Sequence, residues 1–249
     1  MTASGRHQGG GHFPTTRWSA FEHLNSGSQE VRQRSFEAII GAYWKPVYKY
    51  VRFKWHKSFD DAGDVTQAFF TAAIEKDYFQ GFDPAKGRFR TFLRVCVDRF
   101  VQKQNKKMGS LKRGAGYGFI SFDFEAAERE LGQVDDSGAL DQEAFFHREW
   151  VRELYRVSVE HLRATLSEAG KETDFLVFEA YDLHEGDEAR PSYQLLAERF
   201  DMSTTQVTNK LYAVRSRFRN AVLEKLRELT ATEAEFRAEA RFVLGVEAP

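Results

Sequence analysis

Large hydrophobic residues recur at every third or fourth position along most of this 249-residue chain, which is the spacing of one face of an α-helix. The first such run extends from Thr16 to Phe53, and Pro46 within it is expected to kink the helix or to begin a new one. A second helix is expected to start at Asp60 or Asp61, either of which can cap it. A third, long helix is expected from about Phe89 to Lys107.

The periodic pattern stops between Gly109 and Asp141, a stretch with six glycines and many charges that predicts a linker. Helical periodicity returns from about Gln142 to Glu168 and from about Thr173 to Leu183, and no stretch shows a clear strand pattern. The chain is therefore predicted to be all-α, with two small helical domains joined by a flexible linker. The expected division is a disordered leader (1–12), a first helical domain (13–108), an acidic flexible linker (109–144), a second helical domain (145–229) and a C-terminal tail (230–249).

The second domain ends in two helices joined by a short turn, which predicts a helix-turn-helix. The first helix is expected over Ser192–Phe200, with Leu195, Leu196 and Ala197 facing inward. The turn is Asp201–Ser203, and Thr204 begins the second, longer helix. Glycine usually holds the first position of such a turn, so Asp201 is expected to adopt a left-handed backbone.

The N-terminal end of this second helix carries short polar side chains that suit base edges and phosphates in a major groove. They are Thr204, Thr205, Gln206, Thr208, Asn209 and Lys210. Three arginines further along are placed to reach the DNA backbone, namely Arg215, Arg217 and Arg219. The alternative interpretation is an ordinary helical hairpin with a charged face.

The net charge of −1 conceals a strong segregation of charge along the chain. Ala85–Arg113 holds ten basic residues and one acidic residue, whereas Ser121–Glu153 holds ten acidic and three basic residues. Arg199–Arg227 is basic again, with seven basic against two acidic residues. Two basic blocks separated by an acidic block suggest two modules that bind a polyanion, although each block alone also fits a solvated helix face.

The remaining composition argues against several other classes of protein. The single cysteine, Cys96, excludes an internal disulfide and is expected to be a core residue in a reducing cytoplasm. No secretory signal and no run of about 18 apolar residues is present, so no membrane partner is expected. The phosphate-loop, G-x-S-x-G and H-E-x-x-H motifs are missing, so neither a cofactor nor an enzymatic activity is expected. A metal-dependent nuclease built on Asp60, Asp61 and Asp64 is a remote alternative.

Two motifs in the first domain resemble one known family. Residues 61–70 read DAGDVTQAFF and residues 89–93 read FRTFL. Both resemble the second conserved region of the extracytoplasmic-function group of bacterial sigma factors, and the helix-turn-helix resembles the family's fourth region. The resemblance covers about 13–107 and 145–229. It implies a bacterial, cytoplasmic protein that binds core RNA polymerase and directs promoter recognition, with catalysis left to the polymerase.

The resemblance also implies roles for individual residues. Asp61, Asp64 and Gln67 would face the clamp helices of the polymerase, and the helix-turn-helix would read the −35 element. The loop Phe82–Arg88, which contains Lys86, would hold a flipped base of the −10 element. Contacts to melted or duplex promoter DNA would come from the following helix, through Arg90, Arg94, Arg99, Gln102 and Lys103.

This chain departs from the family pattern at two acidic positions of the polymerase-binding helix, where it has Gly63 and Ala68. We hypothesise that a Ser/Thr kinase restores negative charge there by phosphorylating a threonine, foremost Thr66, with Thr71 nearby. An anti-sigma protein is an alternative regulator. The tail 230–249 would either pack on the second module, inhibit the protein or form an extra frayed helix. A helix-turn-helix regulator that acts without polymerase is the main alternative function.

Overall fold

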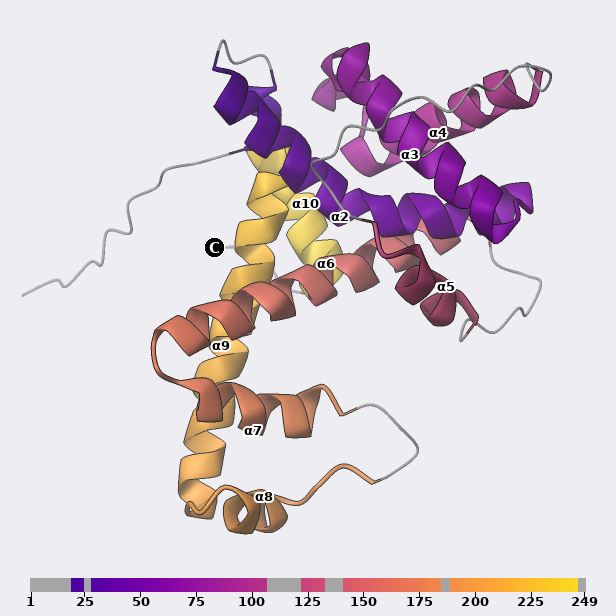
Figure 1. Cartoon of the computed structure of the whole chain (residues 1–249). Helices are drawn as coiled ribbons and strands as arrows, with labels where there is room; N and C mark the ends of the chain where they lie inside the picture. The colour runs from indigo at the N-terminus through magenta and orange to yellow at the C-terminus, as the bar shows by residue number, and fades with distance from the viewer. Residues whose placement is uncertain (1–18, 25–27, 107–121, 133–140, 185–188, 246–249) are drawn as a thin grey trace, which may run out of the picture.

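The computed structural model of the protein describes residues 19–24, 28–106, 122–132, 141–184 and 189–245 (Figure 1). All regular elements in these ranges are helical, which confirms the predicted all-α class. None of the helices there has an apolar stretch long enough to cross a bilayer. The elements are α1 (Ala20–His23), α2 (Gln29–Trp55), α3 (Phe59–Glu75), the 3-10 turns η1 (Tyr78–Gly81) and η2 (Pro84–Lys86), α4 (Phe89–Lys106), α5 (Phe124–Gly132), α6 (Gln142–Glu168), α7 (Glu172–Asp182), α8 (Tyr193–Arg199), α9 (Thr204–Glu228) and α10 (Glu233–Leu244).

The long helix α2 lies at the centre of the fold. Ser28 caps its first turn, and the helix runs without interruption through Pro46 to Trp55. Pro46 thus neither ends α2 nor begins a new helix, although a proline inside a helix removes one backbone hydrogen bond. His56 then adopts a left-handed backbone, with φ of 47°, and ends the helix. Burial of α2 from several sides offsets the lost hydrogen bond.

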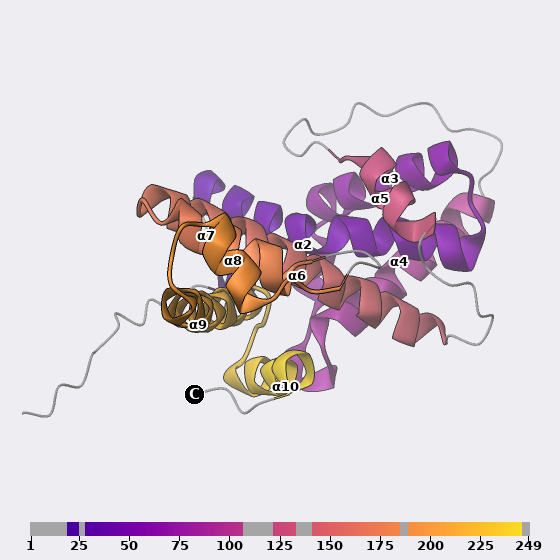
Figure 2. The same ribbon diagram turned by 90° about the horizontal axis from the view of Figure 1, so that it is seen from below.

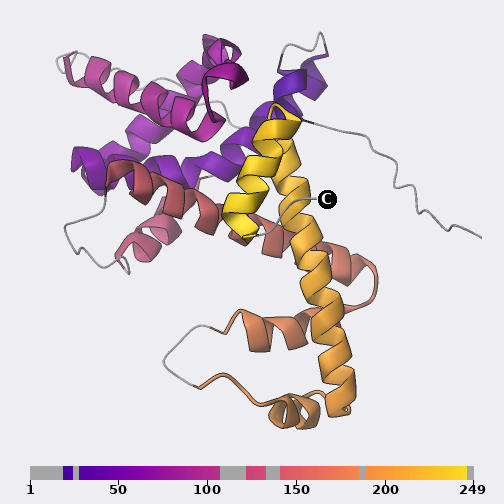
Figure 3. The same cartoon turned by 180° about the vertical axis from the view of Figure 1, so that it is seen from behind.

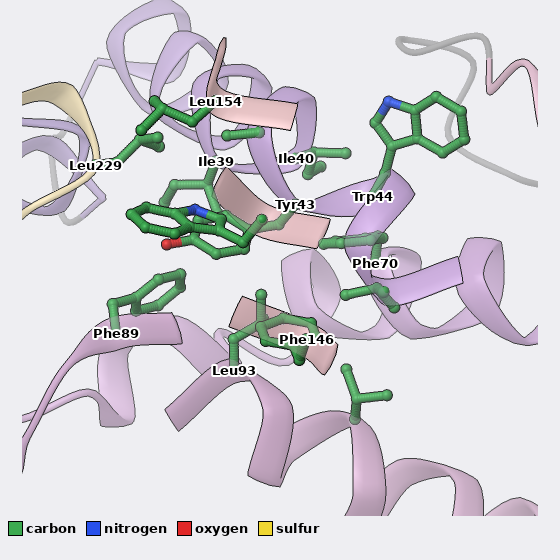
Figure 4. Packing of buried hydrophobic residues seen from close by; sticks show 14 of the residues in the cluster. Ile39, Ile40, Tyr43, Trp44, Phe70, Phe89, Leu93, Phe146, Leu154 and Leu229 are labelled. Carbon is green, nitrogen blue, oxygen red and sulfur yellow. The ribbon is translucent and has the colours of Figure 1, made fainter. Parts of the chain in front are cut away.

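A first core surrounds α2 and takes side chains from both halves of the chain (Figure 4). Tyr43 stacks on Trp150 of α6, with ring centroids 6.2 Å apart, and meets Phe89 of α4 edge-on at 5.5 Å. Leu154 and Leu229, which come from α6 and from the end of α9, lie beside Ile39 (Figure 4). The N-terminal helices therefore share their hydrophobic core with α6, α9 and α10.

A second, smaller core lies where the end of α6, α7, α8 and the start of α9 meet. Its buried side chains include Leu166, Phe178, Leu196 and Leu211. Figures 1 and 3 show these helices projecting from the rest of the molecule, with α9 running from this end back to α10. Phe218 contacts both cores, so the two are joined by continuous helices and not only by loops.

The acidic segment expected to be a flexible linker contains a helix, α5. Phe124 packs on the rings of Trp44 and Tyr48 and lies against Gly63 of α3. Ion pairs from Glu128 and Glu130 to basic residues of α2 hold the same helix. The linker expectation therefore does not describe 124–132, because its aromatic and acidic side chains match the surface of α2.

The expected boundary between the two domains also differs from the structure. The first half of α6 carries Phe145, Phe146 and Trp150 into the first core, whereas Leu162 and Leu166 of the same helix lie in the second core. The cause is the hydrophobic face of α6, which continues unbroken and pairs with α2 before it pairs with α7 and α9. In this structure a domain beginning at residue 145 has no separate core at its N-terminal end.

Candidate nucleic-acid interface

The three residues predicted to bind polymerase lie together on one exposed face of α3. Ser58 caps this helix by accepting the backbone N–H of Asp61. Asp61, Asp64 and Gln67 are exposed, and the residues that alternate with them are buried. The buried set is Ala62, Gly63, Thr66, Phe69, Phe70 and Ala73. Helical geometry thus separates the core residues of the DAGDVTQAFF segment from a solvent-facing acidic surface.

The structure does not support phosphorylation of Thr66 in this conformation. The side chain is 0% exposed, and its hydroxyl oxygen Oγ1 has no hydrogen-bond partner. A kinase needs access to that oxygen, and a buried phosphate would carry about two uncompensated charges. Thr71, by contrast, is partly exposed and lines a cavity of about 210 Å³ beside Gln67 and Phe122. The sequence hypothesis overlooked that Thr66 has the same helical phase as Phe69, Phe70 and Ala73.

The loop 82–88, predicted to hold a flipped base, exposes Pro84, Ala85, Lys86 and Gly87. Phe82 packs on Phe21, Phe89 and Phe92 at the edge of the core and is half-buried. It also lines an open pocket of about 200 Å³, together with Phe79 and Pro84. Lys86 is exposed and forms an ion pair with Asp83 at 3.1 Å. That contact, together with the backbone N–H of Ala85, holds the pKa of Asp83 below its ordinary value.

The residues of α4 that were predicted to contact DNA fall into two groups. Arg99, Gln102 and Lys103 are exposed toward the C-terminal end of the helix and are free to face a nucleic-acid strand. Arg94 is partly buried and contacts the hydroxyl of Tyr50 and the carboxylate of Glu143, each at 3.4 Å. The predicted DNA-binding track is therefore open at its C-terminal half only.

Arg90 and Arg88 begin the same track, and both are engaged by the C-terminal helix α10. Arg90 is buried against Glu239, and Arg88 lies 3.5 Å from the same carboxylate. The expectation that Arg90 reaches DNA is wrong for this conformation, because its guanidinium lies inside the protein. The sequence interpretation did not anticipate this contact, since Glu239 is 149 residues away in the chain.

The turn between α8 and α9 has the backbone that the sequence predicted. Asp201 adopts a left-handed conformation with φ of 49°. Ser203 then caps α9, and Gln206 completes a capping box by accepting the Ser203 backbone N–H at 2.7 Å. Ala197 is buried as expected, but Leu195 is exposed, so its predicted inward position is wrong. Gln206 has a structural role at the cap in addition to any contact with DNA.

The first turns of α9 present most of their predicted contact residues to solvent. Thr204, Thr205, Thr208 and Asn209 are exposed, and the Thr208 hydroxyl donates to the backbone carbonyl of Thr204. A short, polar, accessible surface of this kind at a helix N-terminus suits contact with base edges. Further along α9, Arg217 and Arg219 are also exposed.

Two of the predicted DNA contacts on α9 are used inside the protein. Lys210 forms an ion pair with Asp174, and Arg215 donates two hydrogen bonds, of 2.8 and 2.9 Å, to the carboxylate of Asp182. Both acidic partners belong to α7. These contacts link α7 to α9, so in this conformation Lys210 and Arg215 are paired with carboxylates, although the Arg215 side chain stays 44% exposed.

Tyr212 is the residue of this surface that the sequence interpretation missed. Its side chain is 78% exposed, the highest value among the large hydrophobic residues of the described chain. It follows Thr205 by seven positions and Asn209 by three, so it shares their face of α9. That spacing was visible in the sequence, and an aromatic ring at this position suits contact with a sugar of the DNA backbone.

Two other expectations concern reactive or metal-binding groups. Cys96 is mostly buried, and burial raises the pKa of its thiol, in agreement with a core role. Within the described ranges, no three His, Cys, Asp or Glu side chains are grouped as a metal site requires. The arrangement of Asp60, Asp61 and Asp64 along exposed α3 therefore gives the nuclease alternative no structural support.

Comparisons of the chain with models of known protein families, with curated proteins and with solved structures found no match.

Proposed function

We propose that this protein is a bacterial sigma factor similar to the extracytoplasmic-function group, acting in the cytoplasm with core RNA polymerase and promoter DNA. The observation that carries the proposal is the exposure of Asp61, Asp64 and Gln67 on one face of α3, while the apolar residues between them are buried. These three polar residues form one acidic surface suited to a basic partner helix.

We further propose that α8 and α9 form a helix-turn-helix that reads the −35 element. The left-handed Asp201, the capping box of α9 and the exposed Thr205 and Asn209 support this assignment. The exposed basic part of α4, from Arg99 to Lys103, would contact the promoter strand near the −10 element. The protein would thus supply recognition, and the polymerase would supply catalysis.

Run-off transcription tests the proposal directly. Core RNA polymerase from the source bacterium is incubated with and without the protein on the DNA upstream of the protein's own gene. A defined transcript that requires the protein is the expected result. The absence of such a transcript, with binding to duplex DNA retained, would instead favour a regulator that acts without polymerase, since the surface on α3 would then have no use.

A further inference from the structure

The acidic helix α10 is seated on the first turn of α4, where the proposed DNA track begins. One carboxylate oxygen of Glu235 accepts the backbone N–H of Phe89 at 2.9 Å, and the other accepts the backbone N–H of Ala231 at 2.9 Å. Figure 2 shows α10 beside the start of α4, away from the exposed C-terminal half of that helix. A free helix N-terminus attracts anions, and here a side chain from the tail takes that place.

A second carboxylate of α10, that of Glu239, contacts two arginines of the proposed DNA track. Glu239 pairs with Arg90 through one oxygen and lies 3.5 Å from Arg88 through the other. The side chains of Arg90 and Glu239 are only 1% and 3% exposed. A charge-assisted contact that is shielded from water is stronger than a surface ion pair, so Arg90 is withheld from an outside ligand. The Arg88 side chain is 41% exposed, so its contact with Glu239 neutralises its charge only in part.

The aromatic ring of Phe242 adds to the contacts of Glu235 and Glu239 with the start of α4; these three residues are called the seat of α10 below. Phe242 lies over the Arg90 guanidinium at 4.6 Å and near that of Arg88 at 6.0 Å, while Trp150 approaches Arg90 at 4.8 Å. The arginines thus meet an anionic oxygen and a flat ring, which are also the two groups that a nucleic-acid strand offers as phosphate and base. Phe242 is itself 51% exposed, so it contributes little to the folded core.

We propose that α10 is an intramolecular competitor of the promoter strand, which holds Arg88 and Arg90 until the helix is displaced. This inference rests on the proposed function, because it concerns the regulation of the same DNA track. Opening α10 frees two cations at the start of α4, the helix whose C-terminal half carries the exposed Arg99 and Lys103. Closing it removes them, which lowers the affinity for a single strand.

The contacts that α10 makes elsewhere show what its release would break. The Tyr155 hydroxyl donates to the carbonyl of Val243 at 2.7 Å, and Phe236 and Ala240 are buried. The connection to α9 is fixed by the Ser19 hydroxyl, which donates to the carbonyl of Thr230 at 2.7 Å. Movement about this fixed point separates α10 from α4 and leaves the end of α9 in place.

The test measures binding of the full-length protein to a fluorescein-labelled single-stranded DNA of mixed sequence, by fluorescence anisotropy. Glu239→Gln and Phe242→Ala each weaken the seat, and Glu233→Gln is the matched control. Glu233 lies on the same helix and pairs with Arg227 and Arg237, so its substitution removes one negative charge without touching α4.

Both test variants are expected to bind the strand about tenfold more tightly than the control, because a larger fraction of molecules is open. The plot of log affinity against log salt concentration should also steepen by roughly 0.7 for each arginine released. Phe242→Ala covers the case in which Glu239→Gln fails to fold, since the ring is half-exposed. Folding is checked by circular dichroism.

Variants that are folded and yet bind the strand no more tightly than Glu233→Gln would overturn the inference. This failure is distinguishable from failure of the proposed function. If the wild-type protein directs transcription but the variants bind the strand with unchanged affinity, only the proposed role of α10 is rejected. If the variants bind the strand more tightly but neither they nor the wild-type protein direct transcription, only the sigma-factor assignment is rejected.

Discussion

Lys49 and Glu149 lie 100 residues apart in the sequence, yet their side chains form an ion pair of 2.9 Å with 4% and 0% of their surface exposed. Glu130 of α5 also contacts the Lys49 ammonium, at 2.7 Å. This lysine therefore joins three helices, α2, α5 and α6, at one point. Removing either of these buried charges destabilises the protein, because water cannot reach the remaining charge to replace its partner.

Replacing Lys49 by Met should lower the free energy of unfolding by about 2–4 kcal/mol, because it leaves Glu149 buried with only Arg148 and Arg152 as partners. Urea denaturation followed by circular dichroism measures the change. The control is Arg34→Ala, which breaks the exposed Arg34–Glu30 pair and should change stability by less than about 0.5 kcal/mol. Equal effects of the two substitutions would show that the buried pair adds nothing.

Asp64 lies near the middle of the exposed face of α3, so Asp64→Lys should prevent assembly with core polymerase while leaving the fold unchanged. We expect at least about a tenfold loss of affinity, as is common when one rim charge is reversed at a charged interface. Co-purification with tagged core polymerase measures it. Glu168→Lys reverses a charge on the exposed end of α6 and serves as the control. Wild-type assembly of the Asp64 variant would exclude this surface as the docking site.

Asn209 and Tyr212 should contribute separately to recognition of the −35 element. Asn209→Ala is expected to cost about 1–3 kcal/mol of binding and to relax the preference for the base it contacts. Tyr212→Ala should weaken binding by a similar factor for all sequences, because a ring against the sugar does not read bases. Anisotropy of the holoenzyme on duplex promoter DNA and on single-base variants distinguishes the two patterns. Ser167→Ala, at an exposed position outside α9, should leave both unchanged.

His147 should make the protein less stable in mild acid. Burial, together with the nearby Arg90, lowers the pKa of its imidazole to about 4, whereas an unfolded histidine titrates near 6.5. The folded protein thus binds fewer protons, so its stability is full above pH 6.5 and falls as the pH drops toward 4. The other charged groups that act on this ring are Glu143, Arg88 and Arg94, and Phe242 packs against it.

His147→Gln should remove this loss, which amounts to less than about 1.4 kcal/mol per pH unit because water reaches part of the ring. Urea midpoints between pH 4 and pH 7 measure it. His161→Gln, on an exposed part of α6, should retain the wild-type dependence. If both variants lose stability in parallel with the wild type, the carboxylates and not His147 cause the acid sensitivity.

Asp201 carries a backbone conformation that favours glycine, with φ of 49°. Asp201→Gly should therefore raise stability by about 0.5 kcal/mol, and Asp201→Val should lower it by about 1–2 kcal/mol. The thermal midpoint is the measurement. Gly170→Ala is the converse test, because it replaces a glycine that has φ of +64°. No atom lies close to the added Cβ, so any loss of stability reports the backbone conformation alone. A stable Asp201→Val variant would mean that the turn changes shape at little cost.

The sequence predicted those features that depend on neighbouring residues. Helical periodicity located α4, α6 and the start of α9 to within a few residues. The family resemblance gave Asp61, Asp64 and Gln67 a common role, and the three share one exposed face of α3. The left-handed Asp201 followed from the position of the turn alone. Each of these properties is set within one or two helical turns, so a local pattern is sufficient to find it.

The errors concern contacts between distant segments. Nothing near Arg90 in the sequence indicates that Glu239 will bury it, and Lys210 and Arg215 gave no local sign of their partners on α7. The burial of Thr66 was visible in the helical phase of α3, but a functional expectation took precedence there. A cluster of basic residues in the sequence is an incomplete guide to a binding surface, because carboxylates from distant segments can already pair with some of them in the folded protein.

The helix α6 places Phe145, Phe146 and Trp150 in one core and Leu166 in the other, over a length of about 40 Å. Separating the two ends of the molecule by lifting α6 from α2 would bring all three aromatic rings into water. Together they would form an exposed hydrophobic patch of roughly several hundred Å², which is about the size of the largest such patches on soluble monomers. A molecule opened in this way would need another surface to cover the three rings, because an exposed apolar patch of that size favours association.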